Sequence, residues 1–307
     1  MKSTDMISSK PDWIRKRLPT GNHIQGIEQD LLSRNLRTIC QEARCPNQGE
    51  CFSRGTATFL IMGSICTRNC RFCAVNSGKP ESLDEDEPER VADAVRKMKL
   101  RYVVITSVTR DDLPDGGAGH FARSIRMVRK KNPDAKIEVL ISDLGGSIDS
   151  LKTVIEAEPD VLNHNIETVP RLYSGIRPKA DYGRSIKLLN DAKTVTNSIL
   201  VTKSGMMVGM GETTDEVMGV MKNLKDAQCD ILTIGQYLCP SGNHYPVWEY
   251  VKPEMFAFYR KTALKMGFTD VVSSPFARSS FMAEKSFRIA LGEVNGWNEQ
   301  SQAEISG

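Results

Sequence analysis

Residues 58–75 read TFLIMGSICTRNCRFCAV, a short apolar run that is followed at once by three cysteines. The run 58–62 is typical of a buried strand, and Cys66, Cys70 and Cys73 lie in the loop that follows it. In parallel α/β folds, the loops at the carboxyl ends of the strands carry the chemistry. The stretch therefore predicts a reactive centre beside the first strand of a parallel sheet.

Further apolar runs, rich in Val, Ile and Leu, alternate with helical patterns along the rest of the chain. Because these runs lack strict alternation, they suit parallel strands that are covered on both faces. The order predicts an α/β fold of right-handed βαβ units. About six units, fewer than the eight of a complete TIM barrel, favour a partial (βα)6 barrel over a doubly wound sheet. The predicted strands are 58–62, 102–107, 137–142, 161–166, 199–202 and 231–237, and the predicted helices lie near 88–99, 119–131, 147–157, 183–193, 213–228 and 254–266.

This repeat divides the chain into three predicted parts. A leading extension covers 1–55, the partial barrel covers 56–268, and a trailing extension covers 269–307. Prolines and short polar residues, which favour the first turn of a helix, stand at several predicted helix starts. They are Pro88, Ser147, Thr213 and Pro253.

The composition is that of an ordinary globular protein. The 307 residues are 40% hydrophobic and 26% charged, and the net charge of +3 is too small to indicate nucleic acid or an anionic membrane as a partner. The chain contains no apolar run long enough to span a bilayer. The first ten residues, MKSTDMISSK, lack an apolar signal core, so a cytoplasmic location is expected.

Six of the eight cysteines lie within 34 residues. They form a first triad, Cys40-x4-Cys45-x5-Cys51, and a second triad, Cys66-x3-Cys70-x2-Cys73. A cubane iron–sulfur cluster has four irons, so three thiolates leave one iron for another ligand. The two triads therefore point to two clusters, each with one position that is not cysteine, which suits chemistry better than electron storage.

Other uses of these cysteines were weighed. Structural zinc prefers four Cys or His ligands, and only Cys70 and Cys73 form a typical pair in a chain with four histidines. Disulfides are usual in small secreted scaffolds, and an electron carrier would supply four cysteines for each cluster. The isolated Cys229 and Cys239 fit small core residues better than ligands.

The second triad, with Phe72 between its last two cysteines, resembles the radical S-adenosylmethionine (SAM) superfamily. The first triad and its neighbours Arg44, Pro46 and Asn47 resemble the auxiliary-cluster motif of the lipoyl synthase family. That resemblance covers nearly the whole chain. It continues in the segments 11–15, 107–117, 164–170, 203–212, 236–238 and 278–281.

The resemblance implies an enzyme, a sulfurtransferase that inserts two sulfur atoms at carbons 6 and 8 of an octanoyl group on a carrier-protein lysine. The second triad would hold a [4Fe–4S] cluster that binds SAM and cleaves it to a radical. The first triad, with Ser280 or its neighbour Ser279 as the fourth ligand, would hold a second [4Fe–4S] cluster that gives up sulfur. No side chain beyond the cluster ligands is implied as a catalyst.

The implied carriers are the glycine-cleavage H protein and the lipoyl domains of 2-oxoacid dehydrogenases, with ferredoxin or flavodoxin as an electron donor. Neither a nucleic acid nor a membrane is implied as a partner. The runner-up is another two-cluster radical SAM enzyme, such as a methylthiotransferase or a biotin-synthase-like sulfur inserter. Two further hypotheses belong to other classes of protein: an iron–sulfur electron carrier and a zinc-stabilised binding module.

Contacts to SAM are expected at the carboxyl ends of the later strands. Asn165 and Glu167 end the fourth predicted strand, and Arg184 suits the SAM carboxylate. Gly209 and Gly211 form a tight loop that packs on adenine or is merely a turn. His164, an isolated histidine at a strand end, is expected to have a structural role. Three methionines, Met206, Met207 and Met210, are expected first as packing residues and second as the lining of a tunnel for the octanoyl chain.

The sequence departs from the family pattern in places. The residues around Asp143 read Ile-Ser-Asp-Leu where Pro-Asp-Phe is usual, although the aspartate itself is kept. Thr109 and Phe281 replace the usual Asp and Tyr. None of these positions is an implied cluster ligand, so the reaction type is unaffected.

Overall fold

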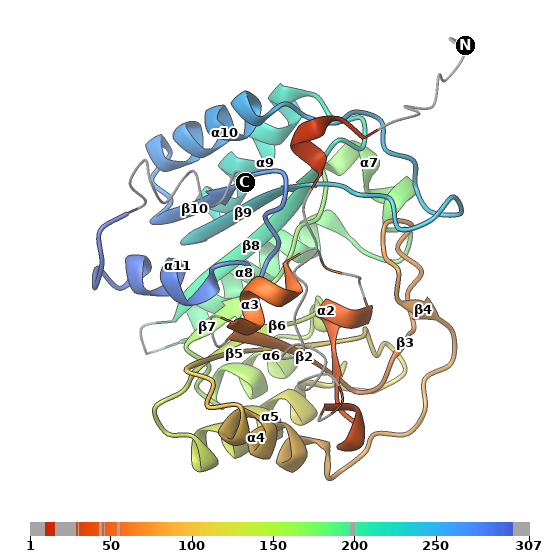
Figure 1. The fold of residues 1–307 in the computed structure, drawn as a ribbon, viewed down its shortest axis with the longest axis vertical. Helices are drawn as coiled ribbons and strands as arrows, with labels where there is room; N and C mark the ends of the chain where they lie inside the picture. The colour runs from red at the N-terminus through yellow and green to blue at the C-terminus, as the bar shows by residue number, and fades with distance from the viewer. Residues whose placement is uncertain are drawn as a thin grey trace.

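The fold is an open, mostly parallel barrel that is wrapped by helices (Figure 1). The computed structural model describes residues 10–15, 29, 31–42, 45, 47–53, 56–196 and 200–296. The main sheet has eight strands in the order β1-β2-β5-β6-β7-β8-β9-β10, and neighbours from β2 to β10 are parallel, whereas β1 is antiparallel to β2. These strands are β1 Arg37–Thr38, β2 Thr56–Ile61, β5 Tyr102–Ser107, β6 Lys136–Leu140, β7 Val161–Asn163, β8 Val201–Val208, β9 Ile231–Gln236 and β10 Asp270–Ser273, and a separate pair is formed by β3 Ile65–Cys66 and β4 Asn76–Ser77.

The helices follow the strands in the expected alternation and begin at the expected residues. Ser147 accepts a hydrogen bond from the Ser150 amide, and Thr213 forms a reciprocal capping box with Glu216. Proline stands in the first turn of α4 and α10. The helices are α2 Ile39–Glu42, α3 Gln48–Ser53, α4 Glu87–Lys97, α5 Ala118–Lys131, α6 Ile148–Ile155, α7 Pro170–Ile176, α8 Tyr182–Val195, α9 Thr214–Asp226, α10 Pro253–Lys265 and α11 Ala283–Ala290, with short 3-10 helices at Asp12–Ile14 and Leu144–Gly146.

The predicted fold class, an α/β partial barrel with parallel strands, is confirmed, and all six predicted strands are present. The fifth prediction, 199–202, was too short, because β8 runs to Val208; its first residue, Ile199, lies outside the described residues. The structure adds β10 as a seventh parallel strand within the predicted trailing extension. No helix in the described part of the chain is long and apolar enough to cross a membrane.

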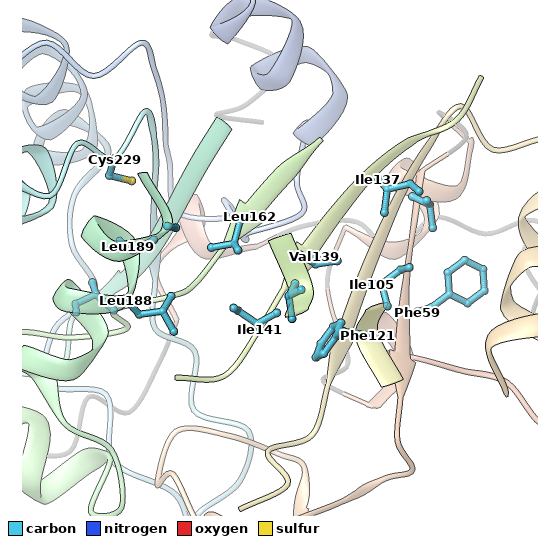
Figure 2. Packing of buried hydrophobic residues seen from close by; sticks show 14 of the residues in the cluster. Phe59, Ile105, Phe121, Ile137, Val139, Ile141, Leu162, Leu188, Leu189 and Cys229 are labelled. Atoms are coloured by element: carbon cyan, nitrogen blue, oxygen red, sulfur yellow. The ribbon is translucent and has the colours of Figure 1, made fainter. Parts of the chain in front are cut away.

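Two apolar layers hold the barrel together. The outer layer lies between the strands and the helices, and Figure 2 shows Ile105 and Leu162 in it together with Phe121 of α5 and Leu188 of α8. The inner layer fills the end of the barrel where the strands begin. There Phe287 of α11 packs among strand-entry residues, of which the larger ones are listed here: Tyr102, Val161, Val201 and Ile231.

A buried ion pair lies between the strands that enclose this inner layer. The Lys203 ammonium donates to both Glu138 carboxylate oxygens at 3.0 and 3.2 Å. The Tyr102 hydroxyl and the Asn163 amide also donate to this carboxylate, so the buried charge of Glu138 is well satisfied. The end of the barrel where the strands begin is therefore filled by apolar side chains, with a satisfied ion pair beside them.

Candidate functional site

The second triad is built into the loop that leaves β2, at the carboxyl end of the barrel. The backbone amides of Arg68 and Thr109 donate hydrogen bonds to Cys66 Sγ, at 3.4 and 3.3 Å. A tight turn, in which the Cys73 amide donates to the Cys70 carbonyl at 3.0 Å, brings the other two cysteines together. Amides that point at a sulfur stabilise its anionic form, as iron ligation requires.

Two thiols of the second triad, Cys70 and Cys73, have a raised pKa. Burial raises the pKa of Cys73 to about 12, and the nearby Cys70 and Cys66 add to the rise. Burial also raises the pKa of Cys70, which the positive charge of Arg177 partly offsets. Because a coordinated metal deprotonates a thiol, cluster binding at this site would release protons.

The donor set fits a cubane cluster. In a [4Fe–4S] cluster each cysteine binds a different iron, so three ligands stand apart around the cluster instead of meeting at one ion. Among the described residues, no three His, Cys, Asp or Glu side chains are close enough together to hold one metal ion. The Cys70 and Cys66 thiols both raise the pKa of Cys73, so the three side chains lie near one another.

Arg177 is a site residue that the sequence did not reveal. It follows α7, and its Nη1 donates to the Tyr173 hydroxyl at 2.7 Å and to the backbone carbonyls of Asn165 and Ile166 at 3.2 Å. Its positive charge acts on the Cys70 thiol and counters the rise in the pKa of that thiol. An arginine after a short helix carries no sequence signal of its own, since only the fold brings it to the cysteines.

Asn165 and Glu167 lie beside the second triad, as the prediction for SAM contacts requires. The Asn165 amide donates to Glu167 Oε1 at 3.1 Å, and burial raises the pKa of the Glu167 carboxyl. Glu167 has φ of 67°, a left-handed conformation that is strained for a residue other than glycine. Backbone hydrogen bonds to Gly205 and Met207 of β8 hold it in this conformation.

Arg184, the predicted partner of the SAM carboxylate, reaches the same end of the barrel from α8. Its Nε donates to Asp143 Oδ2 at 2.9 Å, and its side chain is about one third exposed (32%). Gly146 makes room for this side chain, because a Cβ at Gly146 would lie 2.9 Å from Arg184 Cδ. Arg184 is thus positioned by a buried carboxylate and has further guanidinium donors.

The predicted loop of Gly209 and Gly211 is a turn that the Glu212 carboxylate closes. Glu212 accepts hydrogen bonds from the amides of Gly209 and Met210. A side chain at Gly209 would collide with Gln236, and Gly211 faces the ring of the exposed Trp248. The glycines therefore allow close packing after β8.

The first triad lies between the leading segment and the barrel. Cys40 is buried in α2, and burial, followed by the nearby Cys45, raises its pKa to about 12. The Cys45 amide donates to the Cys40 carbonyl at 2.9 Å. Cys51 of α3 packs in an apolar cluster with Phe281 and Met282. The predicted motif neighbours Arg44 and Pro46 lie outside the described residues.

The segment 276–281 connects the first triad to the barrel mouth. The Asn47 amide donates to the Phe276 carbonyl at 2.6 Å in a buried contact. Two glycines of the barrel leave space for this segment, because a Cβ at Gly235 would lie 3.0 Å from Arg278 Nη1 and 2.2 Å from the carbonyl oxygen of Ala277, and a Cβ at Gly205 would lie 3.0 Å from Ser279 Oγ. In Figure 1, α3 and the start of α11, which flank these contacts, lie close together.

This segment reaches both predicted centres. The charges of both Cys45 and Glu167 act on the buried Arg278 guanidinium, although burial is the larger effect and lowers the pKa of Arg278. Ser279 Oγ donates to Asn165 Oδ1 at 2.9 Å. The segment therefore adjoins Cys51 of the first triad through Phe281 and Asn165 of the barrel through Ser279, with the predicted ligand Ser280 between Ser279 and Phe281.

Comparison with known proteins agrees with this geometry. Residues 60–224 match the radical SAM superfamily. The fold is similar to that of a crystal structure of methylornithine synthase, with a TM-score of 0.54, 13% identity and coverage of 95% of this chain and 98% of that one. It is also similar to the FeFe-hydrogenase maturase of Carboxydothermus hydrogenoformans, with a TM-score of 0.58, 15% identity and coverage of 87% and 68%. The fold and the sequence match together define a radical SAM enzyme.

Two curated relatives narrow this class. The lipoyl synthase of Caldanaerobacter subterraneus subsp. tengcongensis is 54% identical over 94% of this chain and 100% of its own length. The lipoyl synthase of Desulfotalea psychrophila is 55% identical, with coverage of 94% and 96%. The chain belongs to the lipoyl synthase family. Membership in this family implies SAM, a [4Fe–4S] cluster and an octanoylated protein substrate.

Proposed function

We propose that this enzyme converts a protein-bound octanoyl-lysine into the lipoyl cofactor, by inserting two sulfur atoms at carbons 6 and 8 that come from a cluster on the first triad. The observation that carries the proposal is the segment 276–281. Its Phe276 binds Asn47, which lies between Cys45 and Cys51, its Phe281 packs near Cys51, and its Ser279 donates to Asn165 of the barrel. A sulfur donor and a hydrogen-abstracting centre must serve the same carbon, so both must open into one cavity.

The second triad, Cys66, Cys70 and Cys73, would hold the [4Fe–4S] cluster that binds SAM. When bound, the cluster and SAM together supply a one-electron cleavage of SAM and the radical that removes hydrogen from an unactivated methylene. The protein binds and orients the reactants. Asn165 and Glu167 offer an amide and a carboxylate beside the triad.

Arg184 and the glycine turn complete the proposed SAM site. Arg184 would bind the SAM carboxylate with the guanidinium donors that Asp143 does not engage. Gly209 and Gly211 would form the wall beyond β8. This wall is packed against Gln236 and Trp248, which gives it a fixed shape.

The first triad, Cys40, Cys45 and Cys51, would hold the second [4Fe–4S] cluster with Ser280 as its fourth ligand. Ser279 already donates its hydroxyl to Asn165, which favours the neighbouring serine for the cluster. A hydroxyl is a weaker iron ligand than a thiolate, and it would make one corner of the cluster easier to open. The proposed division of labour therefore follows the three predicted parts, 1–55, 56–268 and 269–307.

The proposed carriers of the octanoyl group are the glycine-cleavage H protein and the lipoyl domains of 2-oxoacid dehydrogenases. Ferredoxin or flavodoxin would supply electrons. A cytoplasmic location stays a prediction. The octanoyl chain would pass the partly buried Met207, which packs with Phe72 of the cysteine loop beside the buried Met210 and Tyr237.

Mass spectrometry of an octanoyl-lysine carrier peptide tests this function. The peptide is incubated without oxygen with reconstituted enzyme, SAM and a strong reductant. The expected product has gained two sulfur atoms and lost two hydrogens, and 5′-deoxyadenosine appears with it. Deoxyadenosine with an unmodified peptide would contradict the proposed substrate, and the absence of both from enzyme that contains both clusters would contradict the proposed chemistry.

A further inference from the structure

The loop of the second triad contains a buried arginine that the proposed reaction does not use. Arg68 lies between Cys66 and Cys70, and its side chain is only 5% exposed. Its Nε and Nη2 donate to the two carboxylate oxygens of Asp111, at 2.8 and 2.7 Å. Its Nη1 and Nη2 donate to the two oxygens of Asp143, at 3.0 and 2.6 Å. One guanidinium therefore grips two carboxylates in forked geometry, the strongest arrangement that an ion pair adopts in proteins.

These contacts join three separate loops at the carboxyl end of the barrel. Arg68 belongs to the loop after β2, Asp111 to the loop after β5 and Asp143 to the loop after β6. Asp143 is completely buried and also accepts from Arg184 Nε of α8. Two arginines and two aspartates thus form a balanced network of four charges. Such a network is stable in a buried place only when every member keeps its partners.

Backbone contacts of the same loop support this network. Thr67 donates its amide and its hydroxyl to the Thr109 carbonyl, both at 3.0 Å, and its hydroxyl accepts from the Asp111 amide at 3.1 Å. The amides of Arg68 and Thr109 are the two donors to Cys66 Sγ. The side chain of Arg68 therefore holds together the two backbone segments whose amides donate to Cys66 Sγ.

We propose that Arg68 is a positioning residue that, through Asp111 and Asp143, fixes the loop of the second triad for cluster binding before any metal is present. This inference rests on the proposed cluster site. Asp143 has a second role in the same network, because it holds Arg184 and Arg68 with one carboxylate. The shape of the cluster loop and the position of the proposed SAM-carboxylate ligand are therefore coupled through a single buried group.

The test uses the full chain with Cys40→Ala, Cys45→Ala and Cys51→Ala as the parent, so that only the cluster of the second triad is observed. Arg68→Met, Arg68→Lys, Asp143→Asn and Asp111→Asn are made in this parent. Arg71→Met is the matched control, because Arg71 lies in the same loop but is exposed, and its side chain contacts the Tyr245 ring and the Gly175 carbonyl instead of a carboxylate network. The rate and extent of iron uptake during anaerobic reconstitution and the reduction potential of the bound cluster are measured.

Iron uptake should be severalfold slower in Arg68→Met, Arg68→Lys and Asp143→Asn than in the parent, while Arg71→Met takes up iron like the parent. Lysine keeps the charge but cannot form both forks, so Arg68→Lys separates positioning from charge. Uptake by Arg68→Lys at the rate of the parent would overturn the inference. So would equal uptake by all the variants.

The reduction potential distinguishes this role from simple loosening of the loop. Loss of the positive charge in Arg68→Met should lower the potential, because the reduced cluster carries one more negative charge. Loss of a negative charge in Asp143→Asn should raise it, and Arg68→Lys should leave it near that of the parent. Shifts of Arg68→Met and Asp143→Asn in the same direction would contradict the inference.

Two further results distinguish failure of this inference from failure of the proposed function. If Asp143→Asn does not fold, Asp111→Asn gives the same test from the half-exposed side of the network, with slower uptake and a raised potential expected. A parent that takes up no cluster would count against the proposed function, and the inference falls with it. A parent that loads normally beside variants that load equally well would count against the inference alone.

Discussion

The two cysteine triads are held in different ways. The second triad stands on one loop of the barrel, with backbone amides on Cys66 Sγ and a buried arginine network beside it. The first triad stands on short elements, the four-residue α2 and the six-residue α3. Segments far away in the sequence complete its surroundings, as when Asn47 binds the Phe276 carbonyl across 229 positions.

This difference suits two different duties. A centre that cleaves SAM in every round must keep its geometry, and a scaffold of parallel strands with satisfied polar networks provides that. A cluster that gives up sulfur must open and be replaced. The proposed site of the first triad, assembled from two chain segments with the Ser280 hydroxyl as the proposed fourth ligand, would do so without disturbing the barrel.

The largest expected effect separates the two triads by chemistry. Replacement of Cys66, Cys70 or Cys73 by Ala should abolish SAM cleavage, because each would remove a proposed ligand of the cluster that SAM binds. Replacement of any cysteine of the first triad should leave SAM cleavage measurable and remove sulfur insertion. Deoxyadenosine and the modified carrier peptide are measured in the same reaction.

Cys229→Ala is the control for the loss of a thiol as such. Cys229 is completely buried in the core, far from both triads in the sequence, so this variant should keep both products. If both sets of variants lost only sulfur insertion, the division of labour between the triads would be wrong.

Acidification should lower the free energy of unfolding of the barrel, which carries the second triad. Burial, with the nearby charge of Arg177, lowers the pKa of His164 to about 4 from an ordinary 6.5. The unfolded chain therefore takes up a proton that the folded chain resists, and the free energy of unfolding falls as the pH drops from about 6.5 to about 4, by about 3 kcal/mol in total. Urea unfolding of the cluster-free chain at a series of pH values measures this.

His164→Phe is the comparison for that slope. His164 Nδ1 is hydrogen-bonded to the Ile141 carbonyl, so the variant should be less stable at pH 7, but its stability should depend less on pH. An identical pH dependence in the variant and the unaltered chain would show that other groups are responsible.

The link between the first triad and the trailing segment should carry a smaller effect. Asn47→Ala removes the hydrogen bond to the Phe276 carbonyl, which costs about 1 kcal/mol of stability. The variant should lose the first cluster more readily, while SAM cleavage persists. Iron content after gel filtration and the yield of deoxyadenosine are the measurements.

Asn132→Ala is a matched control for that change. The Asn132 amide donates to the Ala92 carbonyl at 3.0 Å, between α5 and α4, away from the cysteines. It should lower stability comparably and retain both clusters. Equal loss of the first cluster from both variants would mean that general destabilisation explains the effect.

The sequence predicted the regular part of the fold because its signals are local. Apolar runs and helix starts gave six strands, β2 and β5 to β9, and the six long helices between and after them. The loop of the second triad could be placed because it directly follows an apolar run. β10 was missed, since its four residues, DVVS, are too short and too polar at their ends to stand out as a strand.

The parts that escaped prediction depend on contacts between distant segments. Arg68 meets Asp143 over 75 positions, and Lys203 meets Glu138 over 65, so neither pair has a local pattern. Both Glu138 and Lys203 look like solvent-facing residues of ordinary strands, yet they face each other in the interior. Only the order of the strands in the sheet reveals such pairs. The same holds for Arg177 beside Cys70.

The smallest expected effect concerns two adjacent serines, Ser279 and Ser280, that are proposed to serve different triads. Ser279→Ala removes the hydrogen bond to Asn165, worth about 1 kcal/mol, and should weaken SAM binding slightly while the first cluster is retained. Ser280→Ala should leave SAM binding unchanged and lower both the retention of the first cluster and the yield of sulfur insertion. SAM affinity, iron content and product yield are compared for the two variants. The opposite assignment, with the first cluster lost in Ser279→Ala alone, would mean that the trailing segment shifts when the cluster binds and that Asn165 releases its serine to it.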